Sequence, residues 1–476
     1  MRQISLKICA MLCALVTGAC VSPVPESLRA ANGETRWVRA VDSDATGEVS
    51  EAWLTTLGDA ELEATIGQAL SNNYALAQAA ARMEQAWFTL KTTRAASLPA
   101  VSLTLDSSRR RIGAGPQNNN FGGSAGGEPI DVFGLGLDIV WQADIWRELS
   151  AANRSAALTY AAAEAAYLDQ RRRLVASVAR NWFALAAARA QVEVAALRVA
   201  NAKDSLEIVE SGYRSGINEA LDLYLARNTL ANAENNLAAS EQIVAETEAT
   251  YQLLRANYPG TPVEATPTLR DVDQRPQLGL PATLVTRRAD LQQAWLNLLA
   301  ANADLAVAHK QRFPSITLRA GSSDSADLFP DVFDGTPLGW TLIGTVIQPV
   351  WEAGRLRANT DRARARMREL EYLYLEAANQ AFAEVENAIS QHDALALRIG
   401  AAQQGLVDAE SALRLSLEQY QSGLVNYATV LESQRRAFDA RATMVDLRNQ
   451  RLQNRVDLFE ALGGAYNGSD HMDAKL

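Results

Sequence analysis

The sequence predicts a mainly α-helical protein with a transmembrane β-barrel contribution, built from one unit of helix, β-hairpin and long helical hairpin that occurs twice. The block 98–103 reads LPAVSL and returns as FPSITL at 313–318. The tetrapeptide YRSG at 213–216 returns as YQSG at 420–423. Each second copy lies roughly 205–215 residues after the first, which is far longer than the period of a solenoid repeat.

The N-terminus reads as a secretory signal peptide over residues 1–19, with a basic start, an apolar stretch over 8–16 and small residues before Cys20. The apolar stretch is too short to span a bilayer, which takes about 20 residues. Its end resembles a lipobox, in which Cys20 receives lipid and becomes the new N-terminus. The alternative is plain cleavage near Ala19.

Composition excludes several classes of function. All three cysteines lie at the N-terminus, at Cys9, Cys13 and Cys20, so the mature chain can form no intramolecular disulfide. A net charge of −10 argues against a nucleic-acid partner. With three histidines and no phosphate-binding loop, we expect no enzyme, no metal and no cofactor apart from lipid on Cys20. Val21 in place of an aspartate favours the outer membrane.

The first repeat is predicted over 53–258, after a lipid-anchored extended arm over 20–52. Pro99 ends its first helical stretch, because proline cannot continue a helix interior. Two strands are predicted at about 99–110 and 130–143.

Apolar side chains alternate with polar ones or glycine along both of these strands. The apolar set is Val101, Leu103, Leu105, Phe133, Leu135, Leu137, Ile139 and Trp141. A period of two with one apolar face is typical of a barrel wall between lipid and a wet lumen, where about 10 residues per strand suffice. An ordinary half-buried hairpin shows the same pattern, so the hairpin alone leaves both interpretations open.

The second repeat is predicted over 283–462, between a proline-rich linker at 259–282 and a C-terminal tail at 463–476. Its strands are expected at about 313–322 and 338–350. The second hairpin alternates less cleanly, because its last strand has apolar side chains on both faces.

Each repeat contains a helix far longer than those of globular domains. Residues 150–211 contain neither glycine nor proline, and roughly 60 residues of helix span about 90 Å. The second long helix is predicted from Leu356 to near Tyr420. Gly216 and Gly423 suit the left-handed position at which a helix ends, so both are predicted to turn the chain at hairpin tips.

Four strands in one chain cannot close a barrel, and open strand edges are not tolerated in hydrocarbon. Closure must therefore come from other copies. Two copies supply about eight strands, too few for a wide pore, whereas a homotrimer supplies about twelve. The long helices exceed the membrane thickness and are expected to form a periplasmic α-helical barrel.

Four stretches show a recognisable pattern, namely 59–86, Leu280-Pro281 with Arg288-Ala289-Asp290-Leu291, 313–316 and 348–356. These stretches resemble the TolC-type outer-membrane factors, and within them the OprM- and NodT-like lipoproteins of RND efflux. Ala289 replaces the family's proline, and 144–147 lacks its usual glycine at a strand-to-helix joint.

The resemblance implies an outer-membrane exit duct that extends into the periplasm. It would pass small molecules from an inner-membrane RND pump through a periplasmic adaptor protein, and it would lie in outer-membrane lipid. A type I protein-secretion duct is the first alternative. The second is a structural periplasmic coiled-coil lipoprotein without a pore.

The same resemblance implies three candidates for a periplasmic gate, namely Asp222, Tyr420 and Glu432. Val425 and Thr429 stand where the TolC pattern has a basic and an acidic residue. The alternative is that Tyr420 packs the hairpin turn and that the two acids are solvated.

Overall fold

A computed structural model describes residues 37–38, 59–110, 129–270, 278, 281–330 and 339–464 of the 476-residue chain. The predicted signal peptide, Cys20, most of the arm at 20–52 and the last part of the tail lie outside the described residues. The chain forms two compact units. The described residues of the first unit lie within Met83–Ala162 and Ala294–Leu373, and those of the second lie within Glu26–Arg82, Ala163–Gln293 and Tyr374–Leu476.

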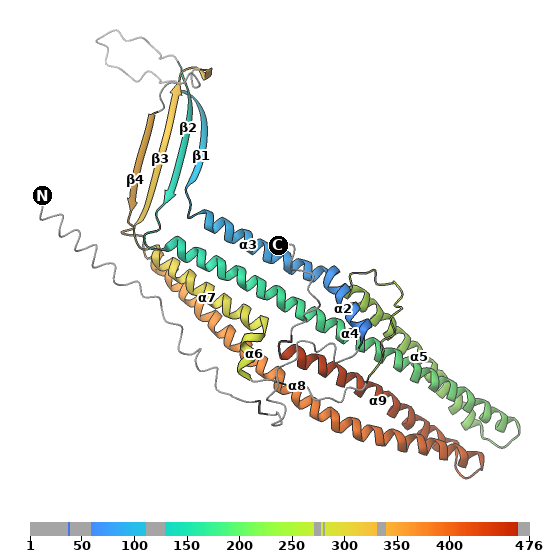
Figure 1. Ribbon diagram of the computed structural model, residues 1–476. Coiled ribbons are helices and arrows are strands. Elements are labelled where there is room, and N and C mark those ends of the chain that lie inside the picture. The colour runs from blue at the N-terminus through green and yellow to red at the C-terminus, as the bar shows by residue number, and fades with distance from the viewer. Residues whose placement is uncertain are drawn as a thin grey trace, which may run out of the picture. The chain divides into compact units, whose positions relative to one another are not determined.

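The first unit contains a four-stranded antiparallel sheet with the strand order β1-β2-β3-β4 (Figure 1). The strands are β1 (Ala100–Arg110), β2 (Ile130–Gln142), β3 (Ser315–Ala326) and β4 (Gly339–Ile347). The two hairpins meet where β2 of the first repeat pairs with β3 of the second. Consequently β1 and β4 form the two edges, and every residue of both strands is exposed.

The second hairpin differs from the predicted bounds of 313–322 and 338–350. β3 begins after Pro314 and continues to Ala326, because the polar residues near its end pair with the start of β2, as Ser325 does with Gly134. β4 ends at Ile347, shortly before Pro349, which has no N–H to give to a ladder.

The strand-to-helix joint after β2 keeps its bend without the family's glycine. Arg147 adopts a φ of 59°, in the left-handed region that glycine usually occupies. For a residue with a side chain this conformation costs roughly 1–2 kcal/mol. Asp144 holds the joint in place, because its carboxylate accepts from the backbone N–H of Leu149 at 2.9 Å and of Ser150 at 2.8 Å.

Four helices make two long hairpins. They are α4 (Glu148–Arg214), α5 (Ala220–Leu254), α8 (Arg355–Gln421) and α9 (Tyr427–Ala461). Within the second unit, an ion pair of 2.6 Å between Arg189 and Glu248 joins α4 to α5. A pair of 2.8 Å between Arg441 and Glu410 joins α8 to α9. At the tips, Gly216 and Gly423 have φ values of 76° and 71°, which a side chain would strain.

Four shorter helices complete the described secondary structure. They are α2 (Ala60–Asn72), α3 (Tyr74–Ala95), α6 (Pro281–Arg287) and α7 (Ala289–Lys310). Asp59 caps α2 by accepting from the Leu62 N–H at 3.1 Å and also accepts from the buried Trp182 indole at 2.9 Å. Trp37 of the arm is buried in a cluster with residues of α8, including Val385. Within the described ranges no helix combines the length and apolarity needed to cross a bilayer.

Candidate functional site

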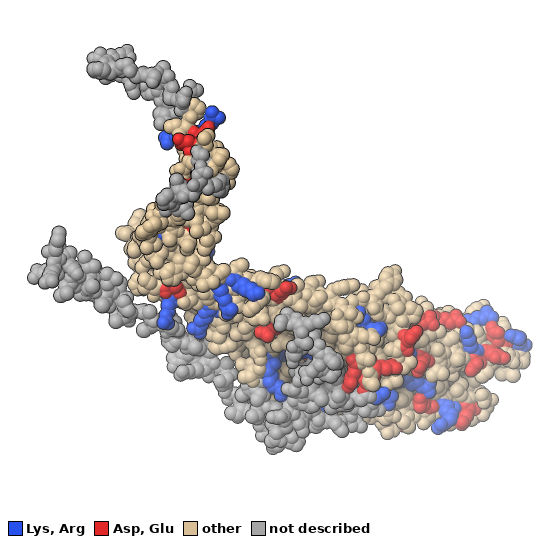
Figure 2. Space-filling model, turned by 45° about the horizontal axis from the view of Figure 1, so that its top comes forward, with Lys and Arg blue, Asp and Glu red and all other residues tan. Residues whose placement is uncertain are grey.

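The sheet has one apolar face, and its strand register aligns that face across the repeats. Leu103 lies opposite Leu137, and Val101 lies opposite Ile139. Ile139 in turn lies opposite Ala320, which lies opposite Leu342. Because side chains alternate along a strand, all of these residues share one face. Figure 2 shows few charged side chains on the visible part of the sheet, except at one end.

The opposite face is polar and contains small residues over most of β1 to β3, whereas β4 places Ile343 and Ile347 on it. Ser102 pairs with Asp138, which lies opposite Gly321. A Cβ atom on Gly134 would lie 2.7 Å from the Asp106 carboxylate, so the glycine leaves room for that side chain. This face suits contact with water, and the apolar face suits contact with hydrocarbon.

The structure brings two of the three predicted gate residues together near the hairpin tips. Tyr420, at the end of α8, packs against a cluster that includes Leu223 and Tyr427. Its ring centre lies 5.6 Å from that of Tyr427. Burial raises the pKa of Tyr420, and the negative charge of nearby Asp222 raises it further.

Glu432 has a different environment on α9. It forms ion pairs with Arg435 at 2.9 Å and with Arg436 at 2.7 Å, both on its own helix. Hydrogen bonds from these two arginines lower the pKa of Glu432 to about 2. The carboxylate is therefore charged at neutral pH, but two local cations compensate it.

Sequence reasoning missed Tyr427 and the polar pair beside it. Tyr427 is the first residue of α9 and is almost fully buried. Gln434 donates to the buried hydroxyl of Ser205 on α4 at 2.8 Å, which links α9 to α4. The spacing of Tyr427, Val430 and Gln434 along one helix face is the signal that could have indicated a buried stripe.

Tyr427 should be one of the last phenols of the chain to ionise. Burial raises its pKa to about 12, with a smaller electrostatic contribution from Tyr420. The pKa of a tyrosine in an unfolded chain is about 10. The stability that this shift contributes is present in full below about pH 10 and is lost as the pH rises to about 12. Absorbance at the phenolate band should therefore lose its step near pH 12 in Tyr427→Phe. Exposed Tyr258, changed to Phe as the control, should leave that step intact.

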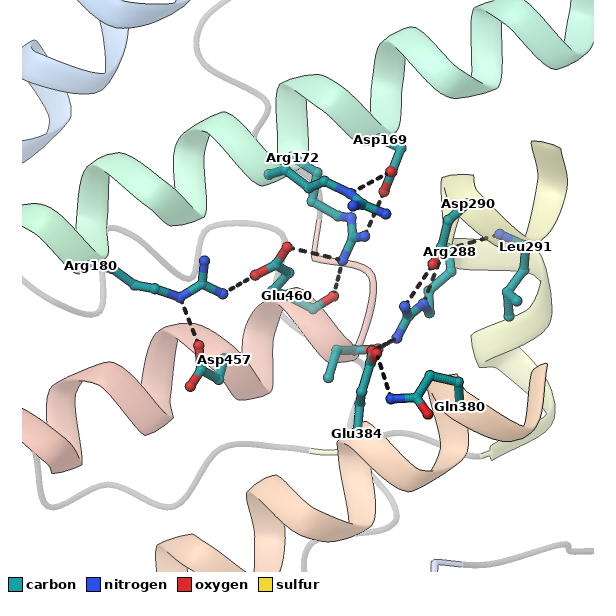
Figure 3. Close-up of polar contacts among 12 residues, drawn as sticks. Asp169, Arg172, Arg180, Arg288, Asp290, Leu291, Gln380, Glu384, Asp457 and Glu460 are labelled. Carbon is teal, nitrogen blue, oxygen red and sulfur yellow. Dashed lines mark hydrogen bonds and ion pairs between the residues drawn. The ribbon is translucent and has the colours of Figure 1, made fainter. Parts of the chain in front are cut away.

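A network of charged side chains, with Arg288, Arg172 and Asp169 as its most buried members, joins four helices of the second unit (Figure 3). Arg288, between α6 and α7, pairs with Asp290 at 2.7 Å and with Glu384 of α8 at 2.7 Å, and donates to the Ala461 carbonyl at 3.2 Å. Burial acts to lower the pKa of Arg288, but Asp290 and Glu384 outweigh it and raise that pKa above its usual value.

Two arginines of α4 continue this network to the end of α9. Arg172 pairs with Asp169 at 2.6 Å and donates to the Glu460 carbonyl, while Arg180 pairs with Asp457 at 2.8 Å and also with the Glu460 carboxylate. The last carbonyls of a helix lack intrahelical partners and carry partial negative charge. These cations therefore fix the C-terminal end of α9.

Residues 65–255 and 280–464 match the family described as Outer membrane efflux protein. The chain belongs to this family. Each of the two matched stretches contains one hairpin of strands and one long helical hairpin. The resemblance to TolC-type outer-membrane factors is thereby confirmed.

Individual relatives agree with this membership. The chain is 33% identical over 463 residues to the pyoverdine export outer membrane protein OpmQ of Pseudomonas aeruginosa, with 95% of each chain covered. It is 29% identical over 416 residues to the cation efflux system protein CusC of Escherichia coli O6:H1, covering 87% of this chain and 88% of CusC. A crystal structure of CusC superimposes with a TM-score of 0.76 at 27% identity, covering 86% of this chain and 93% of that one.

The chain is thus an efflux component located in the outer membrane, as the sequence predicted. Its described fold, mostly helical with a four-stranded sheet, is that of the TolC-like channels.

Proposed function

We propose that three copies of the chain close a 12-stranded barrel in the outer membrane and an α-helical barrel in the periplasm. The combined tube would be the exit duct of a tripartite efflux system, anchored by lipid on Cys20. The observation that carries this proposal is the sheet itself, whose apolar face is exposed while both edge strands lack partners in the described chain. Unpaired edges are unstable in hydrocarbon, and further copies can pair them.

The partners proposed for this duct are a periplasmic adaptor and an inner-membrane RND pump. The names of the relatives support efflux over the type I secretion alternative, since OpmQ exports pyoverdine and CusC belongs to a cation efflux system. Because these two cargoes differ in chemistry, we propose small molecules in general for this chain. A coiled-coil lipoprotein without a pore would not need a sheet with an exposed apolar face.

Gating is proposed at the hairpin tips, with Asp222 and Tyr420 at the centre and Glu432 as an outlying member. A ring of three Asp222 carboxylates in a narrow passage would repel itself and attract cations. Arg435 and Arg436 compensate Glu432, so its contribution to the field in the passage should be smaller.

Single-channel recording in planar bilayers tests the duct, with the mass of the detergent-extracted protein determined in parallel. Discrete conductance steps from a species of three chains are expected. A trimer without conductance would point to a sealed mouth and would call for the same recording on an Asp222 variant. A monomer without conductance would contradict the proposal.

Asp222→Ala is expected to raise single-channel conductance and to weaken any preference for cations. Alanine is shorter than aspartate, so the substitution should widen a constriction beside Tyr420, where the charge of Asp222 raises the pKa of the phenol. The loss of one negative charge per copy accounts for the weaker preference for cations. Glu432→Ala is the matched control and should change conductance less. Equal changes of conductance in both variants would contradict a role of Asp222 in the gate. So would an unchanged conductance of Asp222→Ala in a normally assembled trimer.

A further inference from the structure

A corner contact joins the two repeats within the first unit. The Trp146 indole N–H, just after β2, donates to the Pro314 carbonyl, just before β3, at 2.8 Å. The Trp146 ring also packs on Phe313, with ring centres 5.4 Å apart. Beside them, the Ala143 N–H donates to the Ile316 carbonyl at 2.9 Å. The exit of one hairpin is therefore bound to the entrance of the next.

The duplication supplies a counterpart for each half of this contact, one in each repeat. Trp351 follows β4 as Trp146 follows β2, and Leu98-Pro99 precedes β1 as Phe313-Pro314 precedes β3. The hairpins also close alike at their bases. Trp141, in β2, donates to the Ser97 carbonyl at 3.1 Å, and Gln348, just after β4, donates at 3.2 Å to the carbonyl of Arg312, which is the counterpart of Ser97.

These counterparts do not meet within one chain. They lie at opposite edges of the sheet, because β1 and β4 are separated by two strands. Three strand spacings of about 4.8 Å amount to roughly 14 Å. Trp351 is 82% exposed, and its neighbour Val350 is 92% exposed. Leu98 is 66% exposed.

We propose that Trp351 of one copy repeats the corner contact on a second copy of this chain. Its ring would pack on Leu98 of that copy, and its indole N–H would donate to the Pro99 carbonyl there. The inference rests on the proposed trimeric duct, in which β4 of one copy pairs with β1 of the next. It adds a subunit contact outside the strand ladder, at the joint between strands and helices.

The chemistry of the two surfaces supports this occupant. Trp351 and Leu98 are both apolar side chains left in contact with water in the single chain, and burying them against each other removes that contact. A tryptophan with a satisfied indole N–H is a frequent anchor of protein interfaces. The same type of contact already exists within one chain, where Trp146 after β2 packs on Phe313 and donates to the Pro314 carbonyl before β3.

Cysteine cross-linking tests the contact directly in the full-length protein. The natural cysteines lie at positions 9, 13 and 20, so the strands and helices contain no competing thiol. The double variant Leu98→Cys with Trp351→Cys is oxidised in outer membranes and run on a non-reducing denaturing gel. We expect covalent dimers and trimers that a reductant returns to monomers, because a disulfide forms only where Cα atoms approach within about 7 Å.

Two sets of controls make the result specific. Each single variant should remain monomeric on the gel. The double variant Phe313→Cys with Trp146→Cys should form a disulfide within one chain, which changes the mobility of the monomer without linking copies.

The outcomes separate this contact from the proposed function. If the protein forms conducting trimers but the double variant gives no covalent dimers or trimers on the gel, the corner contact is overturned and the duct is not. Trp351 would then lie against the membrane interface instead. Absence of both trimers and conductance in the unmodified protein would overturn the duct and, with it, this inference.

Discussion

Leu103→Arg is expected to remove the trimer from the outer membrane almost completely. Leu103 lies on the apolar face of β1, opposite Leu137, and is exposed in the single chain. An arginine facing lipid near the middle of the bilayer costs about 2–4 kcal/mol. Three copies in one barrel would therefore lose about 6–12 kcal/mol, which is comparable to the whole stability of a typical domain.

Ser102→Arg is the matched control for this prediction, because it introduces the same side chain one residue away on the other face. Ser102 lies opposite Asp138, so the new guanidinium would find water and a carboxylate. The measurement is the amount of heat-dissociable trimer in purified outer membranes. Similar losses for both variants would contradict the assignment of the faces.

Arg288→Met is expected to destabilise the second unit by roughly 3 kcal/mol, the lower end of the range for breaking a buried ion pair. The Arg288 side chain is only 5% exposed, and methionine keeps an unbranched apolar stem in its place while it leaves Asp290 and Glu384 without their cation. We choose the lower end because Glu384 retains contact with water. The Ala461 carbonyl would also lose a donor at the end of α9.

Denaturant unfolding of the detergent-extracted protein measures this loss. Arg366→Met is the control, because Arg366 pairs with Glu369 at 2.6 Å with both side chains more than half exposed. Surface pairs on one helix contribute about 0.3–0.5 kcal/mol. Equal shifts in the two variants would show that the Arg288 network does not hold the helices together.

Local patterns allowed much of the fold to be predicted. The alternation of Val101, Leu103 and Leu105 indicated a two-faced strand, and the freedom of 150–211 from glycine and proline indicated a helix close to α4. Gly216 and Gly423 have the positive φ that ends a helix at a tip. Such features depend on neighbours in the sequence, whose spacing sets the period of exposure.

Polar strand ends and buried tip residues could not be predicted in the same way. Ser323, Asp324 and Ser325 do not alternate, yet they belong to β3 because β2 pairs with them. Tyr427 looked like an ordinary residue after a turn, and only packing against Tyr420 and Leu223 buries it. In both cases the decisive partner lies far away along the chain, so no local pattern records it.

The residue pattern alone predicted the duplication, the strand-forming and helix-forming segments, the tip glycines and the resemblance to outer-membrane factors. The folded chain was needed to show that β2 pairs with β3, that Trp146 donates to the Pro314 carbonyl, and that Arg288 joins Asp290, Glu384 and the end of α9. The physical reason is that strand order, corner contacts and buried ion pairs depend on which distant surfaces meet. A period of two or of 3.6 residues states which face is apolar, but not what covers it.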